Sequence, residues 1–151
     1  MTIMTVMTVR QILENKGAVV HSVSPGVSVF EALAVMAKYD IGAVLVIEND
    51  RLAGIFTERD YARKLVLKGL HSKEVTVGDL MTPNVCTITP SQTLDAVMNI
   101  MTENRFRHLP VVDHGTIVGI VTIGDVVKSI IVQQEATIQQ LSNYIAGDIA
   151  T

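Results

Sequence analysis

The sequence has little of what secreted, membrane-spanning or nucleic-acid-binding proteins need. Its single cysteine, Cys86, has no partner for an internal disulfide, so a secreted fold held by disulfide bridges is excluded. Charged residues make up only 18% of the 151 residues, and the net charge of −3 lacks the basic excess of DNA-binding proteins. No apolar run approaches the roughly 20 residues of a membrane helix. The first eight residues lack the basic start and cleavage site of a signal peptide, so we expect a cytoplasmic protein.

Sequence signs of catalysis are also missing. The four histidines, His21, His71, His108 and His114, are not at the spacing of metal ligands. Neither a Gly-x-Gly-x-x-Gly motif nor a Walker loop occurs. Cys86 falls within an expected strand, where a small buried apolar residue is a simpler interpretation than a catalytic thiol. We therefore expect neither an enzyme nor a metal site.

An internal repeat organises most of the chain. Residues 20–60 align with residues 85–125 at an offset of 65 without a gap, and 8 of the 41 pairs are identical. Upstream, residues 9–13 resemble residues 77–81, so each copy begins with a short helical lead-in. One copy alone would leave an apolar sheet face uncovered. The two copies are therefore expected to pack on each other as a pseudo-two-fold pair.

Each copy has the pattern β-α-β-β-α. The expected strands are residues 19–23, 43–47 and 52–56 in the first copy and residues 85–89, 109–112 and 117–121 in the second. Apolar residues at helical spacing follow Val29 and Leu94, and a second helix begins near Glu58 and Ile123. The pattern predicts a mixed α/β (α+β) fold with the copies in residues 9–68 and 77–130, joined by a linker at residues 69–76.

The C-terminal segment, residues 131–151, is expected to be a helical extension. Residues 126–145 either extend the last helix of the second copy or form another. Their apolar positions exceed what one short helix needs for its own core: Ile130, Ile131, Ile138, Leu141 and Ile145. This excess indicates the seam of a homodimer.

Both copies contain Gly-x-x-Thr-x-x-Asp where a strand meets a helix, at residues 54–60 and 119–125. Thr57 with Asp60, and Thr122 with Asp125, are suited to capping the helix start. The same groups are suited to a ligand, because a hydroxyl donates to phosphate and a carboxylate accepts from vicinal ribose hydroxyls. The motif alone leaves both interpretations open.

Basic residues near these corners favour the ligand. Arg59, Arg63 and Lys64 follow the first corner, where cations oppose the helix dipole unless an anion binds there. Arg107 and His108 precede the middle strand of the second copy. We expect these five residues to bind phosphate together with the corner threonines.

The repeated unit resembles the cystathionine-β-synthase (CBS) domain, and the tandem resembles a CBS pair, or Bateman module, over about residues 9–130. The resemblance is carried by residues 9–13, the two Gly-x-x-Thr-x-x-Asp corners and residues 107–113. It implies an adenosine ligand between the copies, with AMP first and ADP, ATP, NAD or S-adenosylmethionine as alternatives. It also implies that Asp60 and Asp125 hold ribose and that Thr57 and Thr122 hold phosphate.

The same resemblance assigns the remaining contacts. Arg107 and His108 match the family's basic pair, whereas the first copy has Gly42 and Ala43 at these positions, so the two sites should differ in phosphate preference. The backbone near four residues is expected to contact adenine: Val20, His21, Val85 and Cys86.

Three kinds of function follow from these patterns. The favoured one is a regulatory sensor that binds an adenosine nucleotide and relays its occupancy to an unknown effector protein. The second is a constitutive dimerisation scaffold whose corners only cap helices. An enzyme using Asp60 or Asp125 as a base is disfavoured, because a carboxylate that holds ribose is already occupied.

Overall fold

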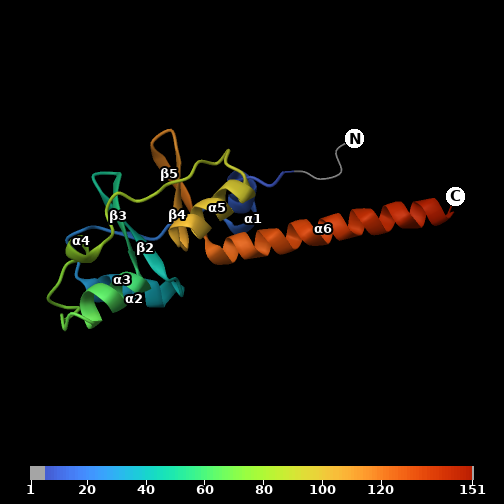
Figure 1. The fold of residues 1–151 in the computed structure, drawn as a ribbon. Helices are drawn as coiled ribbons and strands as arrows, with labels where there is room; N and C mark the ends of the chain where they lie inside the picture. Colours follow the sequence, from blue (N-terminus) through green and yellow to red (C-terminus); the bar gives the residue numbers. More distant parts are fainter. Residues whose placement is uncertain (1–5, 151) are drawn as a thin grey trace.

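The computed structural model describes residues 6–150, with side chains through residue 146. Residues 1–5, which belong to the segment where no signal peptide is expected, and Thr151 of the expected extension lie outside the described residues. The elements, shown in Figure 1, are α1 (Val9–Lys16), β1 (Ser22–Val23), α2 (Val29–Tyr39), β2 (Ala43–Glu48), β3 (Arg51–Thr57), α3 (Glu58–Asp60), the π-helical turn η1 (Tyr61–Val66), α4 (Val77–Leu80), α5 (Leu94–Asn104), β4 (His108–Asp113), β5 (Thr116–Thr122) and α6 (Ile123–Ala150).

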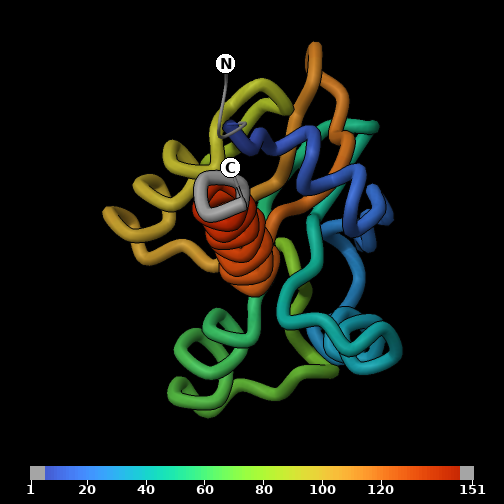
Figure 2. The backbone as a smooth tube through the Cα atoms, turned by 90° about the vertical axis from the view of Figure 1, so that its right-hand side faces the viewer, coloured from blue at the N-terminus to red at the C-terminus, as the bar shows by residue number. Residues whose placement is uncertain are grey.

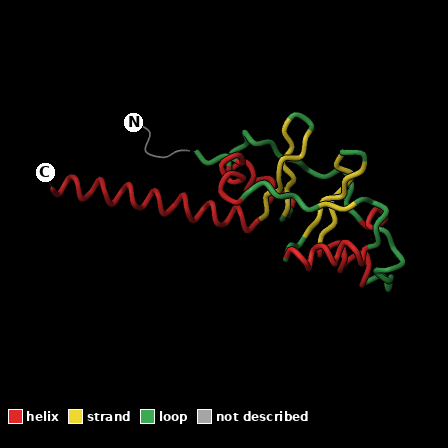
Figure 3. Tube along the Cα trace, turned by 180° about the vertical axis from the view of Figure 1, so that it is seen from behind, coloured by secondary structure: helices red, strands yellow, loops and turns green. Residues whose placement is uncertain are grey.

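The two repeats build the same antiparallel hairpin in the same register. Val44 of β2 lies opposite Phe56 of β3, and Leu109 of β4 lies opposite Val121 of β5, each residue 65 positions from its counterpart. A register shift follows at the equivalent point in both pairs. The two hairpins stand next to each other in Figures 1 and 3. The expected strand pairs and the mixed α+β architecture are thus confirmed.

The first strand of each repeat is shorter than the sequence predicts. Residues 19–23 give only β1, which runs parallel to β2, and residues 85–89 give a single bridge between Ile88 and Val111. In the first repeat the Leu45 amide donates to the His21 carbonyl at 3.2 Å. The equivalent residue in the second repeat is Pro110, which has no N–H to donate. This missing donor accounts for the loss of the strand in the second repeat.

Helices α2 and α5 occupy equivalent places and end in the same way. Ser28 and Thr93 cap their N-termini by accepting the amides three residues on, both at 3.1 Å. Both helices end at a residue in the left-handed conformation, Asp40 with φ 53° and Arg105 with φ 57°. One backbone position therefore carries an acidic side chain in one repeat and a basic one in the other.

The helical lead-ins are exchanged between the repeats. The Val9 amide at the start of α1 donates to the Gln92 carbonyl at 2.9 Å, so α1 docks on the second repeat, beside the β4–β5 hairpin in Figure 2. The Val77 amide at the start of α4 donates to the Val27 carbonyl, also at 2.9 Å, so α4 docks on the first repeat. Each repeat is therefore completed by a segment that the sequence attaches to the other.

Three apolar clusters hold these parts together. The first repeat's core gathers α2, β2, β3 and α4, whereas the second gathers α1, α5, β4, β5 and the base of α6. A third cluster lies between the hairpins, where Ala43, Leu45 and Ile55 meet Ile117 and Ile120. The two sheets thus cover each other through this third cluster, as the repeat predicts.

Helix α6 is one continuous helix of 28 residues that extends well beyond the two repeats (Figures 1 and 3). Of the two alternatives for this segment, the structure shows the extension of the last helix. Val126 and Ile130 pack into the second core, while Ile131, Ile138, Leu141 and Ile145 are exposed. Among the described residues no helix is long and apolar enough to span a membrane.

Candidate functional site

Both Gly-x-x-Thr-x-x-Asp corners form the expected cap. The Thr57 amide donates to Asp60 Oδ2 at 3.0 Å, and the Asp60 amide donates to Thr57 Oγ1 at 3.1 Å. The second corner repeats this geometry, with the Thr122 amide 2.8 Å from Asp125 Oδ2. The capping interpretation is therefore correct for both corners, and any ligand role must be additional to it.

Each corner also lines a cavity between the repeats. The Asp60 cavity, about 250 Å³, is formed by residues 55 and 57–60, residues 82 and 84–86, residues 105–109 and Gly42. The Asp125 cavity, about 500 Å³, is formed by residues 120 and 122–125, residues 16, 17, 19 and 21, residues 40–43 and His108. The two sets correspond almost residue for residue at the offset of 65. The pseudo-two-fold arrangement thus produces two cavities at corresponding positions of the backbone.

The Asp60 carboxylate is buried and engaged at both oxygens. Oδ2 accepts from the amide and hydroxyl of Thr57, while Oδ1 accepts from Thr82 Oγ1 at 3.1 Å and forms an ion pair with Lys64 Nζ at 3.0 Å. A carboxylate has about four acceptor positions. A ribose bound here would share or replace the Thr82 and Lys64 contacts.

The Asp125 carboxylate is engaged at only one oxygen. Oδ2 accepts from the Thr122 amide and forms a 2.6 Å ion pair with Lys16 Nζ, which also donates to the Ile120 carbonyl at 2.8 Å. Within the described part of the chain, no hydrogen bond reaches Oδ1. This oxygen is therefore open to a donor from a ligand.

Three arginines line the Asp60 cavity. Arg59 follows the corner threonine, and its Nη1 donates to the Arg105 carbonyl at 3.4 Å. Arg105 and Arg107 come from the end of α5 and the start of the second hairpin. In the sequence, Arg107 precedes the middle strand of the second repeat; in the structure it lines the cavity at the corner of the first repeat, together with Asp60.

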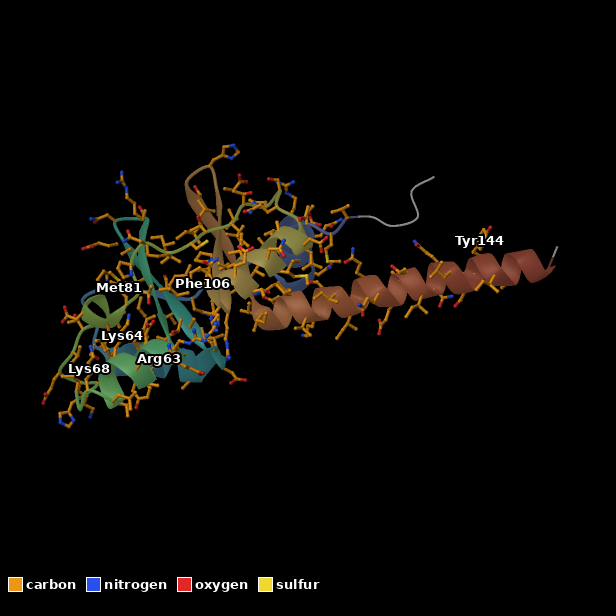
Figure 4. The ribbon with its side chains drawn as sticks, in the orientation of Figure 1. Arg63, Lys64, Lys68, Met81, Phe106 and Tyr144 are labelled. Carbon is orange, nitrogen blue, oxygen red and sulfur yellow. The ribbon has the colours of Figure 1, made fainter. Side chains whose placement is uncertain are left out.

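Two of the five basic residues expected at phosphate do not line either cavity. Lys64 turns to Asp60, the Leu80 carbonyl and Thr82, at 3.0, 3.0 and 3.3 Å respectively. Arg63 lies on η1 and is not among the residues that line the two cavities. In Figure 4 both side chains lie on the first repeat, whereas Phe106 lies near the boundary between the repeats.

His108 lines both cavities, as does Gly42. Burial lowers the pKa of His108 below its ordinary value of 6.5, and the positive charges of Arg107 and Lys16 lower it further, against a smaller opposing effect of Asp125. The lowered pKa makes the neutral imidazole, with a single N–H donor, the main form at pH 7, in contrast to the cation expected from the sequence.

The residues expected at adenine divide between the two sites. Val85 and Cys86 line the Asp60 cavity beside Ile55, Phe106 and Leu109, which together give it an apolar wall. His21 lines the Asp125 cavity, where its ring stacks on Tyr39 with centroids 3.8 Å apart. Val20 packs into the cluster between the hairpins instead of lining a cavity.

Sequence reasoning missed several residues that the structure brings to the sites. Lys16 and Gly17 reach the Asp125 cavity, and Thr82 reaches the Asp60 cavity, because the lead-in segments are exchanged. Asp40 lies in the second site at the position that Arg105 has in the first. The repeat alignment pairs these positions but does not indicate which copy contributes them. In the described part of the chain, no group of three or more His, Cys, Asp or Glu side chains is placed to hold a metal.

Comparison with known proteins places these features in a family. The family model of the CBS domain matches residues 9–67 and 77–132. The mitochondrial CBS domain-containing protein CBSX3 of Arabidopsis thaliana is 40% identical over 125 residues, which cover 80% of this chain and 61% of the relative. This chain therefore spans about three fifths of the length of that relative.

Solved structures agree with the family match. A putative signal-transduction protein with CBS domains from Burkholderia ambifaria is 47% identical, with a TM-score of 0.82 over 85% of this chain and 96% of that one. The CBS domain pair of the protein MJ0100, solved in complex with 5′-methylthioadenosine and S-adenosyl-L-methionine, is 26% identical, with a TM-score of 0.74 over 83% of this chain and 97% of that one. The family to which this chain belongs, on its repeat, its paired corners and these matches, is that of the CBS-domain proteins, with two CBS domains in tandem.

Proposed function

We propose that this CBS pair is a regulatory module that binds an adenosine nucleotide, AMP first, in the Asp60 cavity. The observation that carries the proposal is the meeting of a buried carboxylate, three arginines and an apolar wall in one cavity between the repeats. Stand-alone CBS-pair proteins are typically regulatory and not enzymes, and one structural neighbour holds two adenosine ligands. The signal is whether the cavity holds a nucleotide. ADP, ATP and NAD are the alternatives to AMP as the ligand.

The cavity offers a separate partner to each part of a nucleotide. Val85, Cys86 and Phe106 form an apolar surface against which the base would pack. Asp60 would accept from the ribose hydroxyls, while Arg59 and Arg107 would donate to phosphate. Guanidinium groups suit this task because they bind phosphate with two parallel hydrogen bonds.

Isothermal titration with AMP, ADP, ATP and NAD tests the proposal. We expect saturable heat with at least one of them, and binding at least tenfold weaker for Asp60→Asn, because the amide accepts less strongly and also donates. Asp50→Asn, in the exposed turn between β2 and β3, is the matched control. Absence of binding by all four nucleotides at millimolar concentration would contradict the proposal.

A constitutive scaffold is the second candidate, since both corners already satisfy their own caps without a ligand. It requires the melting temperature to be independent of nucleotide. The sensor requires the melting temperature to rise, because a ligand at 100 times its Kd stabilises the bound state by about 2.7 kcal/mol. Persistence of unchanged AMP and ATP during long incubation would separate the sensor from an enzyme.

We further propose that two chains associate through α6, and that the effector protein recognises this dimer. Val127, Ile131, Ile138, Leu141 and Ile145 are all exposed, and their spacings of 4, 7, 3 and 4 residues place them on one side of the helix, as in a helix–helix seam. Such a stripe is buried when a second copy of the helix packs along it.

Sedimentation analysis of the Ile138→Asp, Leu141→Asp double variant tests the dimer. We expect dissociation to the monomer, while Asn143→Asp, on the other side of the helix, leaves the wild-type state unchanged. A monomeric wild type, or a double variant that still dimerises, would contradict this part of the proposal. The cytoplasmic location stays a prediction, and the Arabidopsis relative is named as mitochondrial.

A further inference from the structure

The two cavities share a backbone but not a charge. At the offset of 65 residues, the counterpart of Arg105 is Asp40, that of Arg107 is Gly42 and that of Arg59 is Gly124. The three arginines line the Asp60 cavity, and their three counterparts line the Asp125 cavity. Every arginine of the first site is thus replaced by an acidic residue or by glycine. No arginine lines the Asp125 cavity within the described chain.

The one lysine that lines the Asp125 cavity in the described chain, Lys16, already has two partners within the protein. Lys16 Nζ lies 2.6 Å from Asp125 Oδ2 and 2.8 Å from the Ile120 carbonyl. A phosphate that recruited Lys16 would have to replace both contacts. With Lys16 paired to Asp125, the Asp40 carboxylate remains as the uncompensated charge of the lining residues. Burial and the nearby cations lower the pKa of His108, so its imidazole offsets little of this charge at pH 7.

The same cavity nevertheless has the parts that a nucleoside needs. Asp125 Oδ1 is open to ribose hydroxyls, whereas both oxygens of Asp60 are engaged. His21, whose ring stacks on that of Tyr39, lines this cavity and adds an aromatic side chain to it. The volume of about 500 Å³ is within the range of small-molecule sites.

We propose that the Asp125 cavity binds an adenosine derivative without phosphate, uncharged or positively charged at its 5′ position, while the Asp60 cavity takes the phosphate-bearing nucleotide. This inference rests on the proposed function in assuming adenosine ligands, and it divides the two sites by charge. An anion in the Asp125 cavity would face Asp40 without an available cation. A 5′-sulfonium or 5′-thioether nucleoside does not meet this repulsion.

Titration of the full chain with adenosine, 5′-methylthioadenosine, S-adenosylmethionine and AMP tests the division. We expect one site per chain for AMP, and one further site per chain for a phosphate-free probe after AMP has saturated the protein. Asp125→Asn is expected to weaken the phosphate-free probe at least tenfold and to leave AMP within twofold.

A variant that adds an arginine to the Asp125 cavity gives a more decisive test than the titration of the wild type. Gly124→Arg supplies the Asp125 cavity with the counterpart of Arg59, and a side chain at this position has room, since its Cβ would meet only Thr122 Oγ1 at 3.6 Å. We expect a second AMP site per chain, with about a tenfold gain in affinity over wild type at that cavity, and weaker S-adenosylmethionine binding. Ser142→Arg, farther along the same helix, is the control.

The outcomes separate this inference from the proposed function. Two equivalent AMP sites in the wild type, or competition between AMP and the phosphate-free probes for one site, would overturn the division and leave the sensor intact. Binding of a phosphate-free probe without any nucleotide binding would overturn the proposed function and support the division. Absence of binding by every probe would overturn both.

Discussion

The two repeats show how much the charge of a cavity can change on an unchanged backbone. Their corners form the same caps, their hairpins have the same register, and α2 and α5 end in the same left-handed residue. The charged residues that line the two cavities nevertheless differ: three arginines beside Glu58 and Asp60 in the first, and Lys16 beside Asp40 and Asp125 in the second. The two repeats therefore share the same capped corner, while the residues around it give the two cavities different charges.

Removal of one arginine from the basic cavity should have the largest effect. Arg107→Ala is expected to weaken AMP binding about 10- to 100-fold, because a hydrogen bond to a charged group contributes roughly 1.5–3 kcal/mol. Binding of phosphate-free adenosine should change little. Isothermal titration measures both, and Arg63→Ala, on η1 outside both cavities, should bind like wild type. Equal losses for the two arginine variants would mean that general charge, not the cavity, attracts the nucleotide.

The paired glycines of the two hairpins should respond unequally to alanine. A Cβ on Gly54 would lie 2.7 Å from Met81 Sδ and 2.8 Å from the Thr82 carbonyl oxygen, whereas the three atoms nearest to a Cβ on Gly119 all belong to the Leu13 side chain, the first at 2.7 Å. A side-chain tip moves more easily than backbone. We expect Gly54→Ala to lower the free energy of unfolding by about 2–3 kcal/mol and Gly119→Ala by about 1 kcal/mol.

Urea unfolding at neutral pH measures the difference between the glycine variants. Gly17→Ala, an equally small change in a residue with φ 95° and open space around it, controls for backbone strain alone. A larger loss for Gly119→Ala than for Gly54→Ala would show that the exchanged lead-ins pack differently from the structure.

Asp60 is engaged at both oxygens and Asp125 at only one, and this difference predicts a smaller effect: removal of a hydrogen-bond donor from Asp60 should strengthen nucleotide binding. Thr82 Oγ1 donates to Asp60 Oδ1 at 3.1 Å, so Thr82→Val frees one acceptor position for ribose. Nucleotide binding should tighten about 2- to 10-fold, because one neutral hydrogen bond contributes roughly 0.5–1.5 kcal/mol. Titration with AMP measures it, with the exposed Thr102→Val as the control. Weaker binding by Thr82→Val would indicate that Thr82 contacts the nucleotide itself.

The histidine shared by both cavities gives the smallest effect, a pH dependence of stability. Burial, Arg107 and Lys16 lower the pKa of His108, so the unfolded chain takes up this proton near pH 6.5 and the folded protein only at lower pH. The free energy of unfolding should therefore fall as pH drops from about 6.5 towards the lowered pKa.

Urea unfolding at pH 7.5 and 5.5 measures this loss, which His108→Gln should reduce and the exposed His71→Gln should leave as in wild type. An equal acid sensitivity in wild type and His108→Gln would show that other groups cause it. Since a bound phosphate would favour the charged imidazole, the same variant should also lessen any tightening of AMP binding on acidification.

The sequence predicted the parts that local rules determine. A gapless match over 41 pairs requires the same backbone twice, so the hairpins, the helices after Ser28 and Thr93 and both capped corners were predicted correctly. The loss of the second repeat's first strand was also predictable in principle, since Pro110 lacks the donor that Leu45 supplies.

The arrangement of the copies could not be read in the same way. Periodicity shows that each copy has a lead-in, but not that α1 covers the second repeat and α4 the first. This exchange is what brings Lys16 to Asp125 and Thr82 to Asp60. The same geometry places Arg107 at the corner of the other repeat. Phosphate contacts for Thr57, Arg59, Arg107 and His108 stay predictions.

The long C-terminal helix would amplify any small movement at the second corner. Asp125 lies in the first turn of α6, so whatever tilts this corner also tilts the helix. Its 28 residues span about 42 Å at 1.5 Å per residue, so a rotation of about 5° at the base would displace the far end by about 4 Å. Binding of a small molecule at this corner would thus displace the end of α6 far enough to change its contact with another protein.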